Sequence, residues 1–163
     1  MVTNSEVFLR KKGGAKGALA RQLFERGYNC AQSVAGAFAA EMGMPQTTVF
    51  RLVSGFGGGM GRLREVCGAV TGMFFVLSAL YGYEDPQADE EKKALYNRVQ
   101  TLAQAFAEEN GSIVCRELLG LKGKKQEPTP EKRTDAYYAK RPCSRLVEQA
   151  ADLLQDHLEA NGE

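Results

Sequence analysis

The sequence lacks tryptophan and has only one histidine, five prolines and four cysteines among its 163 residues. Four cysteines are too few for a disulfide scaffold, and a chain of this length does not need one to build a stable core. None of them forms a C-x-x-C pair, which excludes the thioredoxin motif and the zinc ribbon. Any site that the cysteines share must therefore be assembled by the fold.

The sequence also lacks a strong excess of charge of either sign, with a formal net charge of +1 at pH 7. We therefore expect no nucleic-acid partner and no general attraction to an anionic membrane. In residues 1–14 a short apolar patch precedes basic residues, the reverse of a secretory signal, so we expect a loose arm and a cytoplasmic protein. The longest uncharged run, residues 66–83, has no second run beside it, and we expect a buried helix and no membrane insertion.

No strand-like alternation of apolar and polar residues persists along the sequence. Apolar residues recur instead at helical spacing, which predicts one all-α domain, residues 1–163, built as a bundle of about six to seven helices. The segment at about 65–81 is apolar on all sides, and we expect it to be the central helix. The polar, proline-bearing segment 121–141 predicts a surface loop that could act as a flap. The other helices are expected at 15–27, 29–43, 45–56, 85–111, 112–120 and 142–160.

All four cysteines fall at expected helix beginnings. Counted from the capping residues before them, Cys30 is the first residue of its helix, Cys143 the second and Cys115 the third, while Cys67 lies within the first turn or two of the central helix. The first turn of a helix offers unpaired N–H groups and a partial positive charge, which lower the pKa of a thiol and favour the reactive thiolate. Cysteines that merely fill space should scatter along helices. Their positions therefore favour a functional centre.

Arginines lie near these cysteines in the sequence and should strengthen the same effect. They are Arg64, Arg116, Arg141 and Arg145. Each positive charge favours the thiolate over the neutral thiol.

The segment GFGGGMG at residues 55–61 is dense in glycine. It lacks the G-K-[ST] ending of a phosphate-binding loop, and no strand precedes it, which argues against nucleotide binding. We expect a turn with positive φ at several positions, which glycine adopts at low cost. We also expect these glycines, which have no side chain, to lie beside the thiols and to let a second helix or a cofactor approach Cys67. The candidate cofactor-binding residues are Gly57, Gly58, Gly59 and Gly68.

Five segments of the sequence carry a likeness to a known family. They are GYNCAQSV (27–34), GFGGGMG (55–61), CGAVTG (67–72), NGSIVCRELLG (110–120) and RPCSRLVEQAADLL (141–154). Together they resemble the C_GCAxxG_C_C family of small proteins, whose redox activity is inferred from four defining cysteines. The resemblance implies a helical domain with Cys30, Cys67, Cys115 and Cys143 as those cysteines, and it brings no established substrate.

The sequence leaves three functions open. In the first, the four cysteines are the catalytic residues of a redox centre that cycles through disulfides, with an unknown redox partner and no required cofactor; the protein would be an oxidoreductase. In the second, the same cysteines are metal ligands for an iron–sulfur cluster or zinc. The lack of close cysteine pairs favours the first. In the third, the chain is a non-catalytic helical interaction module with structural cysteines, which could form a homo-oligomer.

Overall fold

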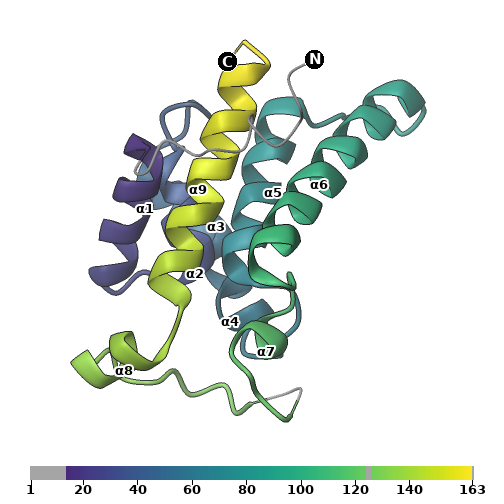
Figure 1. Cartoon of the computed structure of the whole chain (residues 1–163). Coiled ribbons are helices and arrows are strands. Elements are labelled where there is room, and N and C mark those ends of the chain that lie inside the picture. Colours follow the sequence, from purple (N-terminus) through teal and green to yellow (C-terminus); the bar gives the residue numbers. More distant parts are fainter. Residues whose placement is uncertain (1–13, 124–125, 163) are drawn as a thin grey trace, which may run out of the picture.

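The computed structural model describes residues 14–123 and 126–162, so the arm expected at 1–14 lies outside the described residues except for Gly14. Within these ranges six helices of eight residues or more build the domain (Figure 1): α1 (Ala15–Glu25), α2 (Cys30–Ala37), α3 (Gln46–Val53), α5 (Gly68–Tyr81), α6 (Asp89–Asn110) and α9 (Cys143–Ala160). The shorter segments are the 3₁₀ turn η1 (Ser54–Phe56), α4 (Gly57–Met60), α7 (Cys115–Leu118) and α8 (Asp135–Lys140). The described ranges contain no β-strand, and the prediction of a single all-α domain is confirmed.

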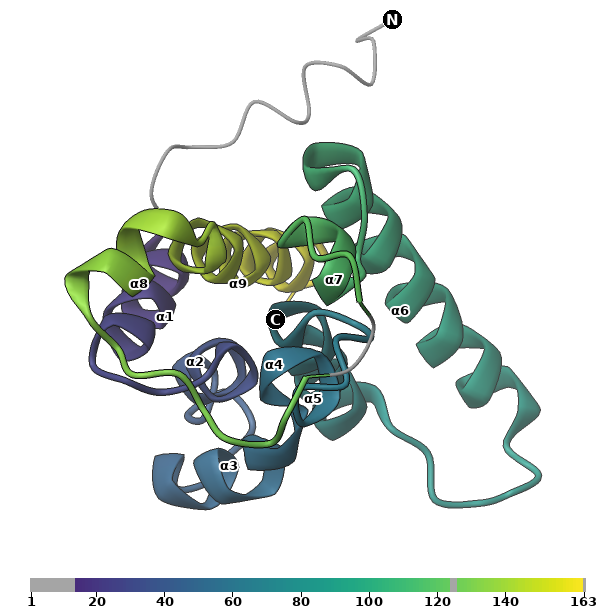
Figure 2. The same cartoon turned by 90° about the horizontal axis from the view of Figure 1, so that it is seen from below.

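The core lies between α2, α5 and α9. Helix α1 packs against α9 and α2, α3 covers another side of α2, and α6 lies along α5 and α9 (Figure 2). Large side chains from several of these elements are fully buried, among them Phe24, Phe38, Met73, Phe106 and Leu154. Burial of each such side chain contributes roughly 1.5–3 kcal/mol, so this apolar core is the main source of stability.

Helix α5 is apolar along its length, as expected, but it is not buried on all sides. Its residues from Gly68 to Val70 are buried, whereas Ser78 and Ala79 near its end are exposed. The helix also begins at Gly68 and not at about residue 65, because the preceding residues pair with another part of the chain. No helix in the described part of the chain combines the length and the apolarity that crossing a bilayer requires.

A β-bridge joins the segments that precede α5 and α7. Val66 and Val114 pair as an isolated antiparallel bridge. On either side of it the amides of Cys67 and Cys115 donate hydrogen bonds to carbonyls across the bridge, over 2.8 and 2.6 Å. The bridge therefore sets the starts of α5 and α7 side by side. It is too short to produce a period in the sequence, although its valines are residues that favour extended backbone.

The segment 121–141, expected as a surface loop, contains a helix. Helix α8 begins after Thr134, whose hydroxyl accepts a hydrogen bond from the amide of Tyr137 over 3.2 Å. Threonine is a favoured N-cap, but a helix of six residues is too short to show a periodic pattern. The described residues before α8 are not helical and run past α4 and α2 (Figure 2).

The close approach of α2 and α3 generates a test of the packing. A Cβ at Gly36 would lie 2.4 Å from the Phe50 ring, which is stacked on Tyr28 at 4.1 Å between centroids. We expect Gly36→Ala to lower the free energy of unfolding by about 1–3 kcal/mol through overpacking, although alanine is the better helix former. Urea unfolding followed by circular dichroism measures this change.

The matched control for Gly36→Ala is Gly55→Ala. No atom lies within 4 Å of a Cβ built at Gly55, and its φ is not positive. We expect this variant to remain within about 0.5 kcal/mol of the parent protein. Equal stability of the two variants would contradict the tight contact between α2 and α3.

Candidate functional site

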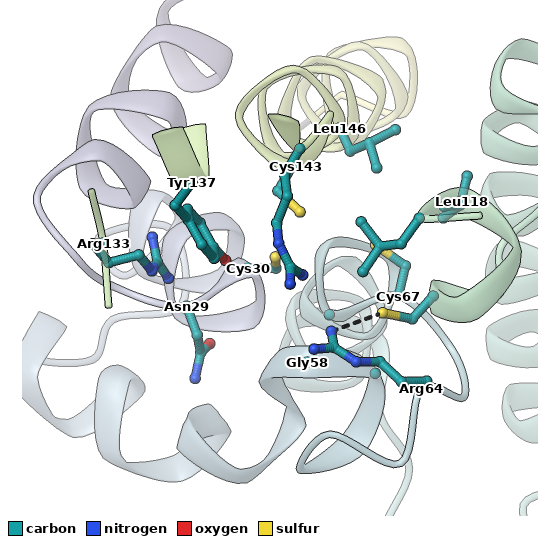
Figure 3. Close-up of a pocket in the computed structure, with 15 residues that line it drawn as sticks. Asn29, Cys30, Gly58, Arg64, Cys67, Leu118, Arg133, Tyr137, Cys143 and Leu146 are labelled. Carbon is teal, nitrogen blue, oxygen red and sulfur yellow. Dashed lines mark hydrogen bonds between the residues drawn. The ribbon is translucent and has the colours of Figure 1, made fainter. Parts of the chain in front are cut away.

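The four cysteines line one cavity of about 50 Å³ at the end of the bundle where α2, α5, α7 and α9 begin. The side chains of Cys30, Cys67 and Cys143 point toward one another there (Figure 3). Cys67, Cys115 and Cys143 are buried, while Cys30 is partly exposed. The fold thus gathers sulfurs that are separated in the sequence by 28 to 48 residues.

Each cysteine stands at a helix start, but three positions differ from those expected. Cys30 is the first residue of α2, as predicted. Cys143 and Cys115 are also first residues, not second and third, because Pro142 precedes α9 as its N-cap and α7 begins only after the β-bridge. Cys67 is the N-cap of α5. All four cysteines therefore stand at or just before the first turn of a helix, although the amides of Cys67 and Cys115 are already paired across the β-bridge.

A capping box fixes Cys30. The Asn29 side chain accepts a hydrogen bond from the amide of Gln32 over 2.9 Å, and the Gln32 side chain accepts one from the amide of Asn29 over 3.0 Å. The Asn29 side-chain amide also donates to the carbonyl of Ser54 over 2.9 Å. The start of α2 is thereby tied to the segment that leads into the glycine turn.

The glycine turn, residues 55–61, has the left-handed backbone that the sequence predicted. Gly58, Gly59 and Gly61 have φ values of 68°, 67° and 60°. Left-handed backbone then continues in residues that have a side chain, at Met60, Arg62 and Arg64, with φ values of 70°, 66° and 58°. Such conformations cost roughly 1–3 kcal/mol each and often occur at functional sites.

Two glycines allow close approach to the cysteines. A Cβ at Gly59 would lie 2.6 Å from the Cβ of Cys115, and one at Gly68 would lie 3.0 Å from the Cβ of Cys30. The element that approaches Gly68 is helix α2. Gly58, Gly59 and Gly68 line the thiol cavity, whereas Gly57 packs against Asn29 and does not. Contact between protein segments explains these glycines, and cofactor binding by them stays a prediction.

Cys30 and Cys143 form an asymmetric pair. The neighbouring Cys30 thiol, helped by Arg141, Arg133 and Arg64, lowers the pKa of Cys143 to about 7 against the opposing effect of burial. The proximity of Cys143, together with burial, holds the pKa of Cys30 well above its usual value. Near pH 7 Cys143 is therefore the sulfur of the pair that ionises, while Cys30 stays a thiol.

The other two thiols are neutral near pH 7. Burial raises the pKa of Cys67 to about 12, although the amides of Ala69 and Val70 act in the opposite direction. Burial also raises the pKa of Cys115, against the effect of Arg64, whose Nη1 lies 3.5 Å from the Cys115 sulfur (dashed line in Figure 3). A helix start alone therefore does not make a thiolate, and only Cys143 has the neighbours that do.

The arginines near the cysteines in the sequence divide into two groups. Arg64 and Arg141 line the thiol cavity. Arg116 instead pairs with Glu65, and Arg145 donates to Asn110, both over 3.1 Å and outside that lining.

Two further residues of the site come from segment 121–141. Arg133 and Tyr137 line the thiol cavity, and their side chains lie side by side in Figure 3. Sequence reasoning missed Arg133 because no cysteine is near it in the chain. Its position is a consequence of how this segment returns past α2.

Four thiols are a suitable donor set for zinc or an iron–sulfur cluster. Within residues 14–123 and 126–162, however, no three His, Cys, Asp or Glu side chains are arranged to hold a metal ion. The sulfurs as placed therefore do not fit such a centre. A thiol of lowered pKa beside a second thiol is instead an arrangement suited to thiol–disulfide exchange.

The asymmetry of the pair predicts a selective reaction of Cys143. Because its pKa is about 7, we expect its alkylation by iodoacetamide to rise with pH with a midpoint near 7, while Cys67, whose pKa is about 12, stays unmodified. Cys30→Ala removes the side chain that lowers the pKa of Cys143 most, so the midpoint for Cys143 should move upward. Peptide mass spectrometry of quenched samples measures the rate at each cysteine.

The control for this experiment is Cys67→Ala. It keeps both Cys30 and Cys143, so the midpoint for alkylation of Cys143 should stay near pH 7. A midpoint for Cys143 in the parent protein at or above the ordinary thiol value would show that the site contains no thiolate near neutral pH.

Comparison with models of known protein families gives a match. The family model described as "Putative redox-active protein (C_GCAxxG_C_C)" matches residues 28–157, a span that includes all four cysteines and the glycine turn. Neither a curated protein nor a solved structure matches the chain. Because the matched span is most of the 163-residue sequence, the chain belongs to the C_GCAxxG_C_C family.

Proposed function

We propose that the protein is a thiol–disulfide oxidoreductase in which Cys143 is the attacking cysteine and Cys30 the resolving cysteine. The observation that supports this assignment is the asymmetric pair, in which Cys30 and Cys143 line one cavity and their pKa values move in opposite directions, that of Cys143 down to about 7. The attacking thiol of an exchange reaction works best when its pKa is near the ambient pH. The family's redox-active description agrees with this chemistry.

The reaction starts with a substrate disulfide, RSSR. The Cys143 thiolate attacks one of its sulfurs, the S–S bond breaks, RS⁻ leaves, and a mixed disulfide forms between Cys143 and RS. Cys30 then loses its proton to the leaving thiolate and attacks the Cys143 sulfur, which releases the second RS group. The two protein sulfurs are oxidised to one disulfide, and RSSR is reduced to one RSH, which carries the proton of Cys30, and one RS⁻, which takes a proton from water.

Cys67 and Cys115 serve as a second dithiol in this proposal. The β-bridge sets the segments that carry them side by side, and both line the cavity of the first pair. Their raised pKa values keep them protonated near neutral pH. Exchange between the two pairs would reduce Cys30 and Cys143 again and leave a disulfide between Cys67 and Cys115. An external dithiol of the redox partner would then complete the cycle.

The proposed cycle needs a compartment that keeps thiols reduced, which is the cytoplasm. All four cysteines are free thiols in this structure, the state from which the reaction begins. The metal-centre hypothesis makes a different prediction, because zinc or iron bound by all four sulfurs would block their titration.

Mapping the first disulfide tests the proposal. Reduced protein under nitrogen is mixed with bis(2-hydroxyethyl) disulfide, quenched with acid and digested without reduction. We expect a Cys30–Cys143 link and a loss of about 2 Da from the intact mass per disulfide formed. In Cys30→Ser the reaction should stop at a mixed disulfide on Cys143.

The variant Cys143→Ser should lose the fast reaction, since the remaining thiols have raised pKa values. Circular dichroism shows whether each variant is folded. Reaction of Cys143→Ser at the rate of the parent protein would contradict the proposal. So would stoichiometric zinc or iron in freshly purified protein together with four thiols that do not titrate.

A further inference from the structure

A second cavity, of about 340 Å³, opens beside the thiol cavity. The two share part of their lining, including Arg64, Arg133 and Arg141, so the second cavity gives access to the first. We call it the arginine vestibule, after the four arginines that line it: Arg62, Arg64, Arg133 and Arg141. Its volume is at the small end of the range for small-molecule sites, about 300–1,000 Å³.

The charge of the vestibule is strongly unbalanced. Against its four guanidinium groups, its lining contains one carboxylate, that of Glu131. Glu131 lies 2.5 Å from Arg141 and 4.0 Å from Arg62, so its charge is already paired with these two arginines. The remaining positive charge faces a concave surface, where it attracts anions more strongly than it would on an open one.

Arg64 is the most unusual of the four because it is buried, with 3 % of its surface exposed. Its guanidinium donates to the Gln126 side chain and to the Cys115 thiol, both of which are neutral groups. No described acidic residue forms an ion pair with it. Apart from the Cys143 thiolate, whose pKa it lowers, this buried cation has no counter-ion among the described residues, so a carboxylate that enters the vestibule gains from its presence.

Arg133 is held in position before any ligand arrives. Its two terminal nitrogens donate to the carbonyls of Phe24 and Tyr28, each over 3.1 Å. The guanidinium also lies over the Phe24 ring, 4.3 Å from its centroid, and 4.9 Å from that of Tyr137. No acidic partner for it occurs among the residues that the structure describes. A fixed cation binds an anion with little loss of side-chain entropy.

The two cavities differ in what they admit. The thiol cavity, at about 50 Å³, has room for only a few small groups, whereas the vestibule is several times larger. A substrate that reacts at Cys143 must therefore place its reactive sulfur in the narrow part and the rest of the molecule among the arginines.

We infer that the substrate is a small disulfide that carries carboxylate groups, bound with its carboxylates in the arginine vestibule and its S–S bond at Cys143. This inference rests on the proposed function and specifies its substrate class. Guanidinium groups bind carboxylates through paired, charge-assisted hydrogen bonds. The bonds formed and broken are those of the exchange reaction above, and the carboxylates stay ionised throughout.

Three disulfides that differ in charge test the inference: 3,3′-dithiodipropionate is anionic, bis(2-hydroxyethyl) disulfide is neutral and cystamine is cationic. Each is mixed with reduced full-length protein, and the second-order rate constant for oxidation of Cys143 is measured by quenching and mass spectrometry. We expect the anionic disulfide to react roughly ten- to a hundredfold faster than the neutral one, and the cationic one to be slowest. The preference should fall as salt is added.

Variants of the vestibule locate the effect. In Arg133→Met we expect the anionic-to-neutral rate ratio to fall about tenfold. The ratio within one variant is unaffected by a change in the fraction of thiolate, to which Arg133 also contributes. Arg62→Met is a second variant, which tests the same inference if Arg133→Met does not fold. Arg145→Met is the matched control, because Arg145 is near Cys143 in sequence but lines neither cavity.

Equal rates for the three disulfides, a preference for cystamine, or an unchanged ratio in folded Arg133→Met and Arg62→Met would overturn the inference. In each of these cases the proposed function would stand, since Cys143 would still be oxidised by a disulfide. Failure of all three disulfides to oxidise Cys143 would instead overturn the proposed function itself.

Discussion

The pairing of Cys30 with Cys143 is the interaction on which the chemistry of this structure depends. Burial raises the pKa of every thiol in the cavity, as it does at Cys67. The neighbouring Cys30 thiol and three arginines reverse that effect at Cys143 alone. The two sulfurs of the pair thus ionise at very different pH values, which gives them different roles. Without these neighbours the four cysteines would be a set of inert, neutral thiols.

Much of the local structure serves to bring backbone close to these sulfurs. The capping box at Asn29 fixes the start of α2, and the β-bridge at Val66 fixes the starts of α5 and α7. Gly59 and Gly68 then let neighbouring segments contact Cys115 and Cys30. The left-handed backbone of the glycine turn extends into residues with side chains, and its strain is held by the contacts around it. The larger part of the stability comes from the apolar core farther along α5 and α9.

The helices and the position of each cysteine at a helix start could be predicted from the sequence, because caps and apolar periodicity are local signals. Cys30 after Asn29 is the clearest case. The β-bridge and α8 could not be predicted, since a single bridge and six residues are too short to produce a period. The difference between Cys143 and Cys67 was also beyond the sequence. Both stand at helix starts, and only tertiary neighbours such as Arg133 distinguish them.

The proposed chemistry requires that Cys143 ionise near neutral pH in the folded protein. Thiolate absorbance at about 240 nm measures this directly when the pH titration of Cys143→Ser is subtracted from that of the parent protein. We expect a difference curve equal to one thiolate with a midpoint near pH 7. A difference curve without any titration below the ordinary pKa of a free thiol would contradict it.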